Sequence, residues 1–335
     1  MSFVTFGEIM LRLTPNDHGQ KINSSNTFNV NYAGSESNVA SALGVLNNDI
    51  SFVTKLPSNQ LGDAAVRNLQ GFGVQTNFVV RGGSRIGTYF IEIGDSIRPS
   101  SVIYDRANSA ISTIKEGEFP WEEILRNKKW IFLSGITPVL SEQCAKETIN
   151  VAKIAKELGV KVAFDMNYRR TLWKSNKDAQ LIFNKILGYT DLLFGNAGVL
   201  KDVYEMDFEG DCPEEKTINA VLKAKKKFGI EQLAFTIRKH SSASENELSG
   251  VLLSNNNLSV AKIIKVNITD RFGTGDAFAA ACLHSINKGD ADQEIIDFST
   301  AAFALKHTIK GDQHTSSENE IKSIMEGNIS GHVLR

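Results

Sequence analysis

Short apolar runs and longer helical patterns alternate along most of the chain. Runs rich in Val, Ile and Phe predict buried strands at residues 4–10, 51–55, 130–134, 160–165, 191–194 and 232–237. Apolar residues at helical spacing predict helices at residues 37–46, 63–72, 141–158, 178–187, 214–228, 275–287, 293–309 and 318–325. Because parallel strands are joined through helices, this order predicts an α/β protein with a mostly parallel sheet covered on both faces.

Two segments interrupt this order, at approximately residues 11–33 and 85–106. They alternate apolar and polar residues, as in Phe28-Asn-Val-Asn-Tyr and Thr88-Tyr-Phe-Ile-Glu-Ile, with Gly and Asn at the turns. We expect them to pair with one another as a small separate sheet over the strand ends, where ligands of open α/β sheets bind. No linker-like run divides the chain, so we expect a single domain, residues 1–335, with these lid strands inserted in it.

Charge and cysteine content exclude several classes of partner. The 37 Lys and Arg residues balance 38 Asp and Glu, which leaves no basic field for nucleic acid or an anionic membrane surface. No secretory signal or apolar stretch of membrane-spanning length is evident, so we expect a cytoplasmic protein with a small-molecule partner. Cys144, Cys212 and Cys282 are widely spaced, which argues against a disulfide framework or a metal knuckle.

The sharpest chemical signal is the stretch Asp270-Arg-Phe-Gly-Thr-Gly-Asp276, which runs directly into an alanine-rich helical pattern. A helix N-terminus offers unpaired N–H groups, and glycines let a phosphate approach the backbone closely. Asp276 would lie beside this anion site, placed to accept a proton from an attacking hydroxyl. The alternative is that Asp276 only caps the helix. No GxxxxGK[ST] or strand-linked GxGxxG occurs, which weighs against P-loop enzymes and dinucleotide dehydrogenases.

This stretch resembles the Asp-Thr-x-Gly-Ala-Gly-Asp signature of the ribokinase-like (PfkB) carbohydrate kinases, from which it departs at Arg271 and Thr274. Further family landmarks follow in family order along the chain: Phe6-Gly-Glu-Ile-Met-Leu-Arg-Leu, Ala33-Gly-Ser-Glu-Ser-Asn38 and Gly62-Asp63. The resemblance implies a ribokinase-like three-layer fold and an ATP-dependent kinase. It also implies that Asp276 is the catalytic base and that the amides of Gly273, Thr274 and Gly275 form an anion hole.

The Asp-Arg variant of the signature is similar to the 2-keto-3-deoxygluconate kinase branch of that family. Two further stretches, Tyr104-Asp-Arg106 and Asp165-Met-Asn-Tyr-Arg169, each place an arginine just after an apolar strand. A guanidinium binds a carboxylate through two parallel hydrogen bonds, which a neutral sugar does not need. The resemblance implies acceptor contacts from Gly34, Asn38, Tyr89, Tyr104, Arg106, Arg169 and Asp276. We therefore expect phosphorylation of 2-keto-3-deoxygluconate to 2-keto-3-deoxy-6-phosphogluconate. The alternative to carboxylate binding is that an isolated arginine forms only a surface ion pair. The alternative to a sugar contact at Gly34 is an ordinary strand-to-helix turn.

The nucleotide side departs further from the family. Asn196-Ala-Gly-Val199 stands where many members carry Asn-x-x-Glu, and Thr236-Ile-Arg238-Lys239 stands where many carry Thr-x-Gly-x-x-Gly. Arg238 and Lys239 are candidates for meeting phosphate charge, with solvated surface positions as the alternative. The resemblance implies ATP and Mg²⁺ as cofactors, a monovalent cation as a further candidate, and metal ligands that stay unassigned. It implies nucleotide contacts from Asn196, Thr236, Arg238, Gly273, Gly275, Ala302 and His307.

Other functions stay open at the level of sequence. Within the class, the alternatives are a fructokinase or another PfkB sugar kinase. From a different class, the alternative is a catalytically idle sugar-binding regulator, which the missing glutamate favours and the retained Asp276 opposes. A small sheet with an open face and free edges tends to be covered, so we also expect a homodimer through the lid or a higher homo-oligomer.

Overall fold

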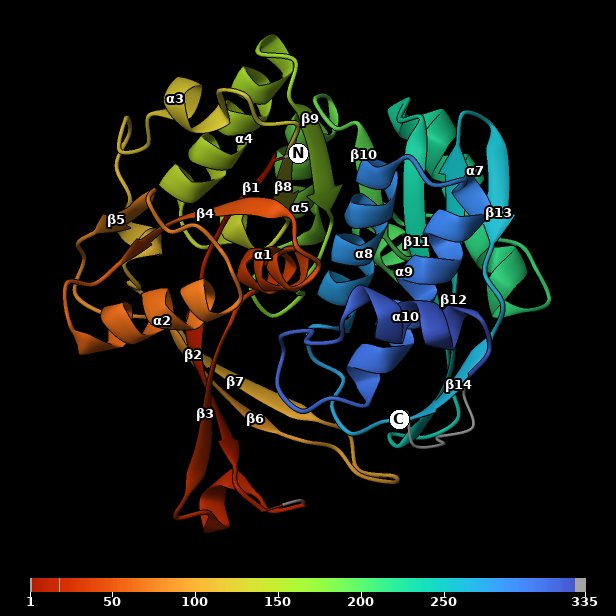
Figure 1. The fold of residues 1–335 in the computed structure, drawn as a ribbon, viewed down its shortest axis with the longest axis horizontal. Coiled ribbons are helices and arrows are strands. Elements are labelled where there is room, and N and C mark those ends of the chain that lie inside the picture. The colour runs from red at the N-terminus through yellow and green to blue at the C-terminus, as the bar shows by residue number, and fades with distance from the viewer. Residues whose placement is uncertain (1, 18, 329–335) are drawn as a thin grey trace.

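The computed structural model describes residues 2–17 and 19–328, in which the chain forms two sheets (Figure 1). The larger sheet has ten strands in this part of the chain, in the order β13-β12-β11-β10-β9-β8-β1-β4-β5, with β14 paired to β12. Pairing is parallel from β5 across to β11 and antiparallel from β11 through β12 to β13 and β14. The strands are β1 (Ser2–Phe6), β4 (Asp49–Leu56), β5 (Val79–Arg81), β8 (Trp130–Ser134), β9 (Lys161–Asp165), β10 (Leu192–Gly195), β11 (Gln232–His240), β12 (Glu245–Ser254), β13 (Asn257–Val260) and β14 (Ile264–Asn267).

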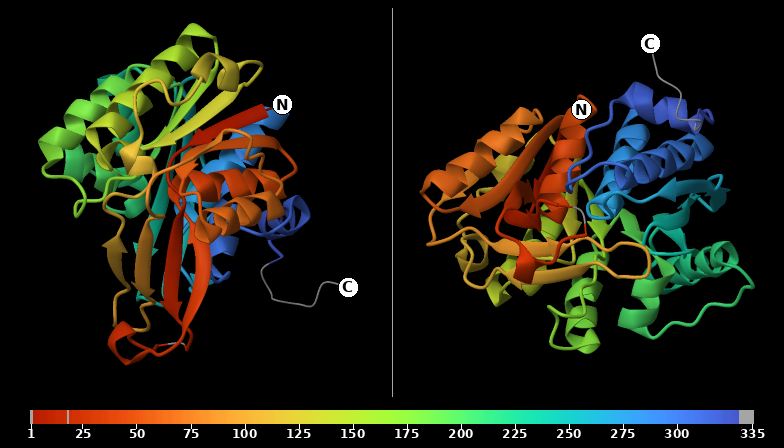
Figure 2. Two further views of the ribbon diagram at one scale, coloured as in Figure 1. Left: turned by 90° about the vertical axis from the view of Figure 1, so that its left-hand side faces the viewer. Right: turned by 90° about the horizontal axis from the view of Figure 1, so that it is seen from below.

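Helices cover both faces of this sheet (Figures 1 and 2). One face carries α1 (Ser35–Val45), α2 (Gln60–Gly71), α8 (Thr274–Lys288), α9 (Asp292–His307) and, packed on α9, α10 (Glu318–Met325). The other face carries α3 (Trp121–Leu125), α4 (Glu142–Glu157), α5 (Asn176–Leu187), α6 (Ala197–Tyr204) and α7 (Pro213–Phe228). Alternation along the strands supplies both cores: Phe3 of β1 packs into the first layer, whereas Val4 and Phe6 pack into the second. The expected three-layer α/β fold is thus confirmed. None of the described helices is long and apolar enough to span a membrane.

The small sheet projects beyond the carboxyl ends of the main strands (Figure 2). Its strands are β2 (Met10–Pro15), β3 (Phe28–Ala33), β6 (Thr88–Glu92) and β7 (Ser101–Asp105), in the order β3-β2-β6-β7. The parallel pairing of β2 with β6 joins the two segments in which the sequence predicted lid strands. One face of this sheet presents Met10, Tyr89 and Ile91, which pack towards Phe272 of the glycine turn. The small sheet therefore lies over that turn.

The expectation of one strand over residues 4–10 was wrong. The structure has two strands, because β1 ends at Phe6 and β2 begins at Met10, where the chain crosses from the main sheet to the small one. The buried side chain of Glu36 lies against the crossing, and a Cβ atom at Gly7 would lie 2.3 Å from its carboxyl carbon. The antiparallel strands β12–β14, the strand β5 and the short helices α3 and α6 were not predicted. All of them except the ten-residue β12 span only three to eight residues, too few for a periodic pattern to be recognised.

A buried ionic network fastens the small sheet to the main layers. Arg12 of β2 is only 1% exposed; it donates to the Asp270 carboxylate at 2.7 Å and also pairs with Asp312. Tyr89 of β6 donates its hydroxyl to the second oxygen of Asp312 at 2.8 Å. Asp270 precedes α8 and Asp312 follows α9, so one guanidinium joins three distant parts of the chain.

We expect Arg12→Met to lower the free energy of unfolding by about 3–5 kcal/mol, because two buried carboxylates would lose their cation. Denaturant titration of the purified protein measures this. Arg81→Met is the matched control: Arg81 pairs with Asp63 at the surface, where both side chains are at least one-third exposed, and its loss should be below about 1 kcal/mol. Equal losses in the two variants would contradict the central role given to Arg12.

Candidate active site

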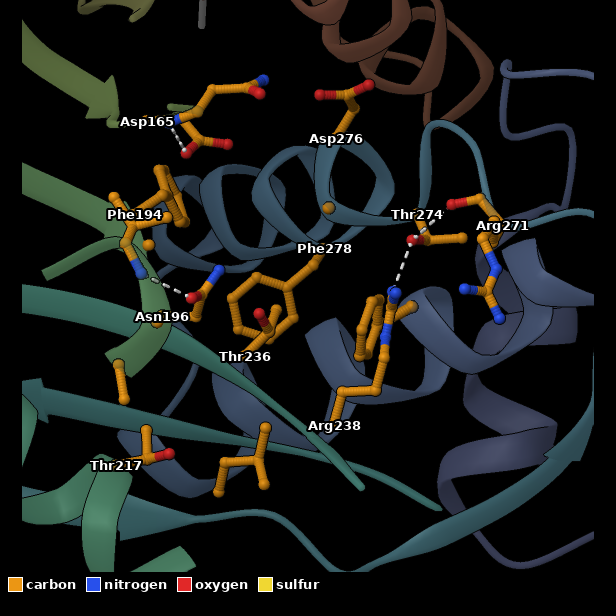
Figure 3. A pocket seen from close by; sticks show the side chains of 18 of the residues that line it. Asp165, Phe194, Asn196, Thr217, Thr236, Arg238, Arg271, Thr274, Asp276 and Phe278 are labelled. Atoms are coloured by element: carbon orange, nitrogen blue, oxygen red, sulfur yellow. Dashed lines mark hydrogen bonds between the residues drawn. The ribbon is translucent and has the colours of Figure 1, made fainter. Parts of the chain in front are cut away.

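A cavity of about 820 Å³ lies at the carboxyl ends of β9, β10 and β11 (Figure 3). Tyr104 of the small sheet lines it on one side, and the turn before α8 lines it on another. Asp165 and Asn196 follow the ends of β9 and β10, so parallel strands bring side chains from distant parts of the sequence to one edge. The volume falls within the usual range of small-molecule sites.

Asp276 occupies the first turn of α8, with its carboxylate in the cavity wall (Figure 3). One carboxylate oxygen accepts the Ser35 hydroxyl at 2.8 Å, and the other accepts the Asn38 amide at 2.8 Å. Asn167 donates in turn to the Ser35 oxygen at 2.8 Å, which fixes the orientation of that hydroxyl. Burial raises the pKa of Asp276 to about 7, more than these hydrogen bonds lower it, and nearby Asp165 adds to the rise. A carboxylate that titrates near neutrality suits a general base.

The glycine turn places backbone N–H groups beside this carboxylate. Helix α8 begins at Thr274, and the N–H of Ala277 makes a helical hydrogen bond to the Gly273 carbonyl at 2.9 Å. The N–H groups of the cap residue Gly273 and of Thr274, Gly275 and Asp276 have no partner within the helix and are available to an anion. Gly273 has φ of 71°, and a Cβ atom there would lie 1.8 Å from the Asp312 carbonyl oxygen, so only glycine fits.

Two guanidinium groups flank the turn. Arg238, at the end of β11, donates to the Thr274 hydroxyl at 3.1 Å, and Arg271 donates to the Ala243 carbonyl at 3.0 Å. Neither pairs with a carboxylate in the described part of the chain. Burial, together with the charge of Arg271, lowers the pKa of Arg238 to about 10, so this cation lacks solvation as well as a counter-ion. Such a pair of cations is suited to phosphate oxygens.

Lys239 is different, because it points away from the turn. Its side chain is exposed and pairs with Glu247 at 3.1 Å. The alternative of a solvated surface position therefore describes Lys239, whereas Arg238 faces the cavity.

The residues expected at the acceptor divide into two groups. Tyr104 and Arg169 line the cavity. Arg106 lies behind its wall: it is 7% exposed, donates to Glu8 at 2.8 Å and rests 5.4 Å from the centre of the Tyr104 ring. Tyr89 is also behind the wall, since it is buried and its hydroxyl is held by Asp312.

The strand-to-helix turn before α1 supports Asp276 from the side. Asn38 donates to the carboxylate, and its own side-chain oxygen accepts the Gly34 N–H at 3.3 Å. A Cβ atom at Gly34 would lie 1.9 Å from the Glu8 carbonyl oxygen. The close approach of these two backbones therefore requires glycine at this position.

On the predicted nucleotide side, Asn196, Thr236, Arg238, Gly273 and Gly275 all line the cavity. Ala302 does not, although the next residue, Phe303, does. His307 lies behind Arg238, and its Nε2 is 3.1 Å from that guanidinium. Burial lowers the pKa of His307 to about 3, so the ring is neutral and orients the arginine.

Asn196 caps the N-terminus of helix α6. Its side-chain oxygen accepts the N–H of Val199 at 3.0 Å. Val199, which stands where many family members carry a glutamate, lines the cavity with an apolar side chain. The Asn196 cap at the start of α6 is therefore present although the glutamate carboxylate is absent.

Sequence reasoning missed Ser35, Asp165, Asn167 and Arg271 as site residues. Ser35 directly follows Gly34, and Asp165 and Asn167 fall within the stretch singled out for Arg169. Asp165 accepts the Asn167 N–H at 3.0 Å, and burial raises its pKa. Position after the end of a parallel strand was the signal that could have identified Asp165 and Asn167.

No group of three or more His, Cys, Asp or Glu residues is arranged to hold a metal ion in residues 2–17 and 19–328. Mg²⁺ that arrives with a nucleotide takes most of its ligands from phosphate and water and needs only one or two carboxylates. Asp165 lines the cavity and supplies a carboxylate of that type, which leaves Asp276 free. The residues present therefore fit a phosphate-bound Mg²⁺.

Comparison with known proteins agrees with this geometry. The family description "pfkB family carbohydrate kinase" matches residues 2–319. A crystal structure of 2-dehydro-3-deoxygluconokinase from Thermotoga maritima is 41% identical, with a TM-score of 0.94 over 98% of this chain and 100% of that one. A 2-dehydro-3-deoxygalactonokinase from Haloferax volcanii is 31% identical over 98% of both chains.

The fold extends to more distant structures. A structure assigned as ribokinase II from Escherichia coli, in complex with ATP and Mg²⁺, has a TM-score of 0.80 at 18% identity and covers 97% of this chain and 99% of that one. The family match spans nearly the whole chain, and the base and anion hole implied by the family's signature lie in one cavity. This chain belongs to the pfkB family of carbohydrate kinases.

Proposed function

We propose that this kinase transfers the γ-phosphoryl group of ATP to a sugar acid, with 2-keto-3-deoxygluconate as acceptor and 2-keto-3-deoxy-6-phosphogluconate as product. The observation that carries the proposal is the buried carboxylate of Asp276. It has a pKa of about 7 and lies beside the free N–H groups of the glycine turn. The names of the two most similar proteins described above, both kinases of keto-deoxy sugar acids, support this class of acceptor. A base and an anion hole in one cavity oppose the alternative of an idle regulator.

In this mechanism the acceptor lies between Tyr104 and Asp276. The Asp276 carboxylate accepts the proton of the primary hydroxyl as its oxygen attacks the γ-phosphorus. The N–H groups from Gly273 to Asp276 stabilise the charge that develops on the transferred group, and Arg238 and Arg271 offset phosphate charge. Mg²⁺, when bound, neutralises charge on the β- and γ-phosphates. The small sheet limits access of water, which would otherwise compete for the phosphoryl group.

Arg169 is our choice for the group that binds the acceptor's carboxylate. It lines the cavity, as Tyr104 does, whereas the Arg106 guanidinium is already paired with Glu8. We assign Arg106 and Tyr89 to support of the acceptor side, behind Tyr104 and the small sheet. Asn38 and Gly34 hold Asp276 in place.

The proposal predicts a strong preference for the keto acid, and the part of that preference that excludes neutral sugars should depend on Arg169. Direct measurement of ADP formation should show turnover with 2-keto-3-deoxygluconate and far less with fructose, ribose or gluconate. Arg169→Gln should lower kcat/KM for the keto acid by about 10- to 100-fold, which is the usual effect of losing a hydrogen bond to a charged group. The same variant should change kcat/KM for neutral sugars by less than about threefold. Arg170→Gln, which removes an exposed partner of Asp202, is the matched control. A wild-type preference for fructose would overturn the choice of acceptor.

The raised pKa of Asp276 predicts an acid limb in the pH profile. The base acts only when deprotonated, so kcat/KM should fall about tenfold per pH unit below a pKa of about 7 and level off above it. Asp276→Asn should lose at least about 100-fold of kcat and lack this limb, because its amide cannot accept a proton. Asp202→Asn, at an exposed carboxylate on α6, should keep the wild-type kcat and the acid limb. A limb near pH 4 would contradict the assignment.

We also propose that two copies associate through the outer face of the small sheet. The register aligns Val30, Leu13, Phe90 and Ile103 in one apolar row across all four strands, on the face opposite Tyr89. Val30 and Ile103 are 56% and 54% exposed, which leaves an apolar surface without cover. Burial against a second copy would cover both this row and the sheet's edges.

Light scattering at micromolar concentration should therefore give the mass of a dimer or a multiple of it. Ile103→Asp should shift the mass to that of a monomer, because it places a charge at the exposed end of the apolar row, on the edge strand β7. Leu181→Asp, at a 63% exposed position on α5, is the control and should leave the mass unchanged. A monomeric wild-type protein would count against the association.

We place the protein in the cytoplasm, where ATP is available. The unpaired thiols of Cys144, Cys212 and Cys282 are compatible with a reducing compartment.

A further inference from the structure

Lys306 is a buried lysine directly behind the glycine turn, and the mechanism above gives it no role. It lies in the last turn of α9 and has no exposed surface. Its ammonium donates to the carbonyl oxygen of Ile309 at 2.9 Å and to that of Gly311 at 2.5 Å. Burial lowers the pKa of Lys306 below its ordinary value, and the nearby charges of Asp270 and Asp312 oppose that effect. Lysines are almost never fully buried without such compensation.

The loop that Lys306 holds is the surface against which the glycine turn rests. The Asp312 carbonyl oxygen contacts Gly273 so closely that a Cβ atom there would lie 1.8 Å away. The Gly311 N–H donates to the Asp270 carboxylate at 3.0 Å, and the same carboxylate group accepts the Phe272 N–H at 3.1 Å through its other oxygen. A shift of residues 309–312 would therefore move the N–H groups that face the phosphate.

The surroundings of the ammonium are those of a cation site. Two backbone carbonyl oxygens point at it, and two buried carboxylates lie nearby. Carbonyl and carboxylate oxygens are the ligands that proteins present to alkali and other hard cations. Here the cation is attached to the chain and needs no binding from solution.

We propose that Lys306 is a positioning residue for phosphoryl transfer and acts as a built-in monovalent cation that fixes the loop beneath the anion hole. This inference rests on the proposed transfer at the glycine turn and goes beyond it. The family resemblance made a monovalent cation a further candidate cofactor. With Lys306 in place, the wild-type enzyme needs no such cation from solution.

The test compares cations in the wild type and in Lys306→Ala. ADP is quantified by chromatography, so that no coupling enzyme brings a cation requirement of its own. Buffers contain tetramethylammonium, potassium or ammonium chloride at about 0.1 M, which keeps screening constant. We expect wild-type kcat to change by less than about twofold among them, while Lys306→Ala loses about 100-fold in tetramethylammonium, with KM for ATP within about threefold.

Potassium or ammonium should restore Lys306→Ala by at least about tenfold, because either ion fits the space vacated beside the carbonyls and tetramethylammonium does not. Lys310→Ala removes an exposed lysine from the same loop and should behave as the wild type. Activation of the wild type by potassium would overturn the proposal, as would full activity of Lys306→Ala in tetramethylammonium. A folded, inactive Lys306→Ala that no cation restores would also overturn it.

Thermal unfolding gives a second measurement that does not depend on catalysis. Potassium or ammonium should raise the Tm of Lys306→Ala relative to tetramethylammonium and leave the wild type unchanged. If no acceptor supports turnover, the proposed function fails. The shift in the Tm of Lys306→Ala still shows whether a cation binds in place of the Lys306 ammonium. If Lys306→Ala does not fold, the wild type decides alone: independence of potassium supports the proposal, and activation contradicts it.

Discussion

The buried guanidinium of Arg12 holds together the parts of the molecule that make the active site. It pairs with Asp270 before the glycine turn and with Asp312 after α9, while its own strand belongs to the small sheet. Isolated buried charges are costly, so none of these elements can separate from the others without a large penalty. Because the Asp312 backbone also contacts Gly273, the position of the lid strand and that of the anion hole are fixed by one network. A hinge for lid movement therefore cannot lie at the base of β2.

The sequence predicted the centre of the fold well, for a physical reason. Strands that are buried on both faces must be almost wholly apolar, so β8 was predicted with its observed bounds, Trp130–Ser134. Helix α10 was predicted with its observed bounds too, and it begins with a capping box between Ser317 and Glu320. The break after Phe6 was missed although Gly7 stands there in the sequence, because the buried Glu36 side chain that leaves no room for a Cβ atom at Gly7 is a tertiary contact that no local pattern records.

In the active site, too, features that are local in sequence could be predicted and features that depend on tertiary contacts could not. The glycine turn and Asp276 were recognisable because a turn that opens a helix is local in sequence, and the structure places them in one cavity. The two arginines were indistinguishable by pattern, since each follows an apolar strand. Only the pairing of Arg106 with Glu8, 98 positions away, shows which one faces the cavity. Residues such as Ser35 act by orienting another side chain, and sequence carries no direct record of that.

Asp276 shows how the chain trades stability for function. Its pKa is about 7 in the folded protein and 3.8 in an ordinary aspartate, so the folded state binds this proton more tightly than the unfolded state does. Between those two pKa values the unfolded state holds fewer protons, and this group lowers the stability of the fold as pH rises. Above pH 7 the full penalty is present, at the very pH where the base is active. The network of Arg12, Asp270 and Asp312 keeps its charges paired at that pH, and it holds the turn in place around a carboxylate that burial disfavours.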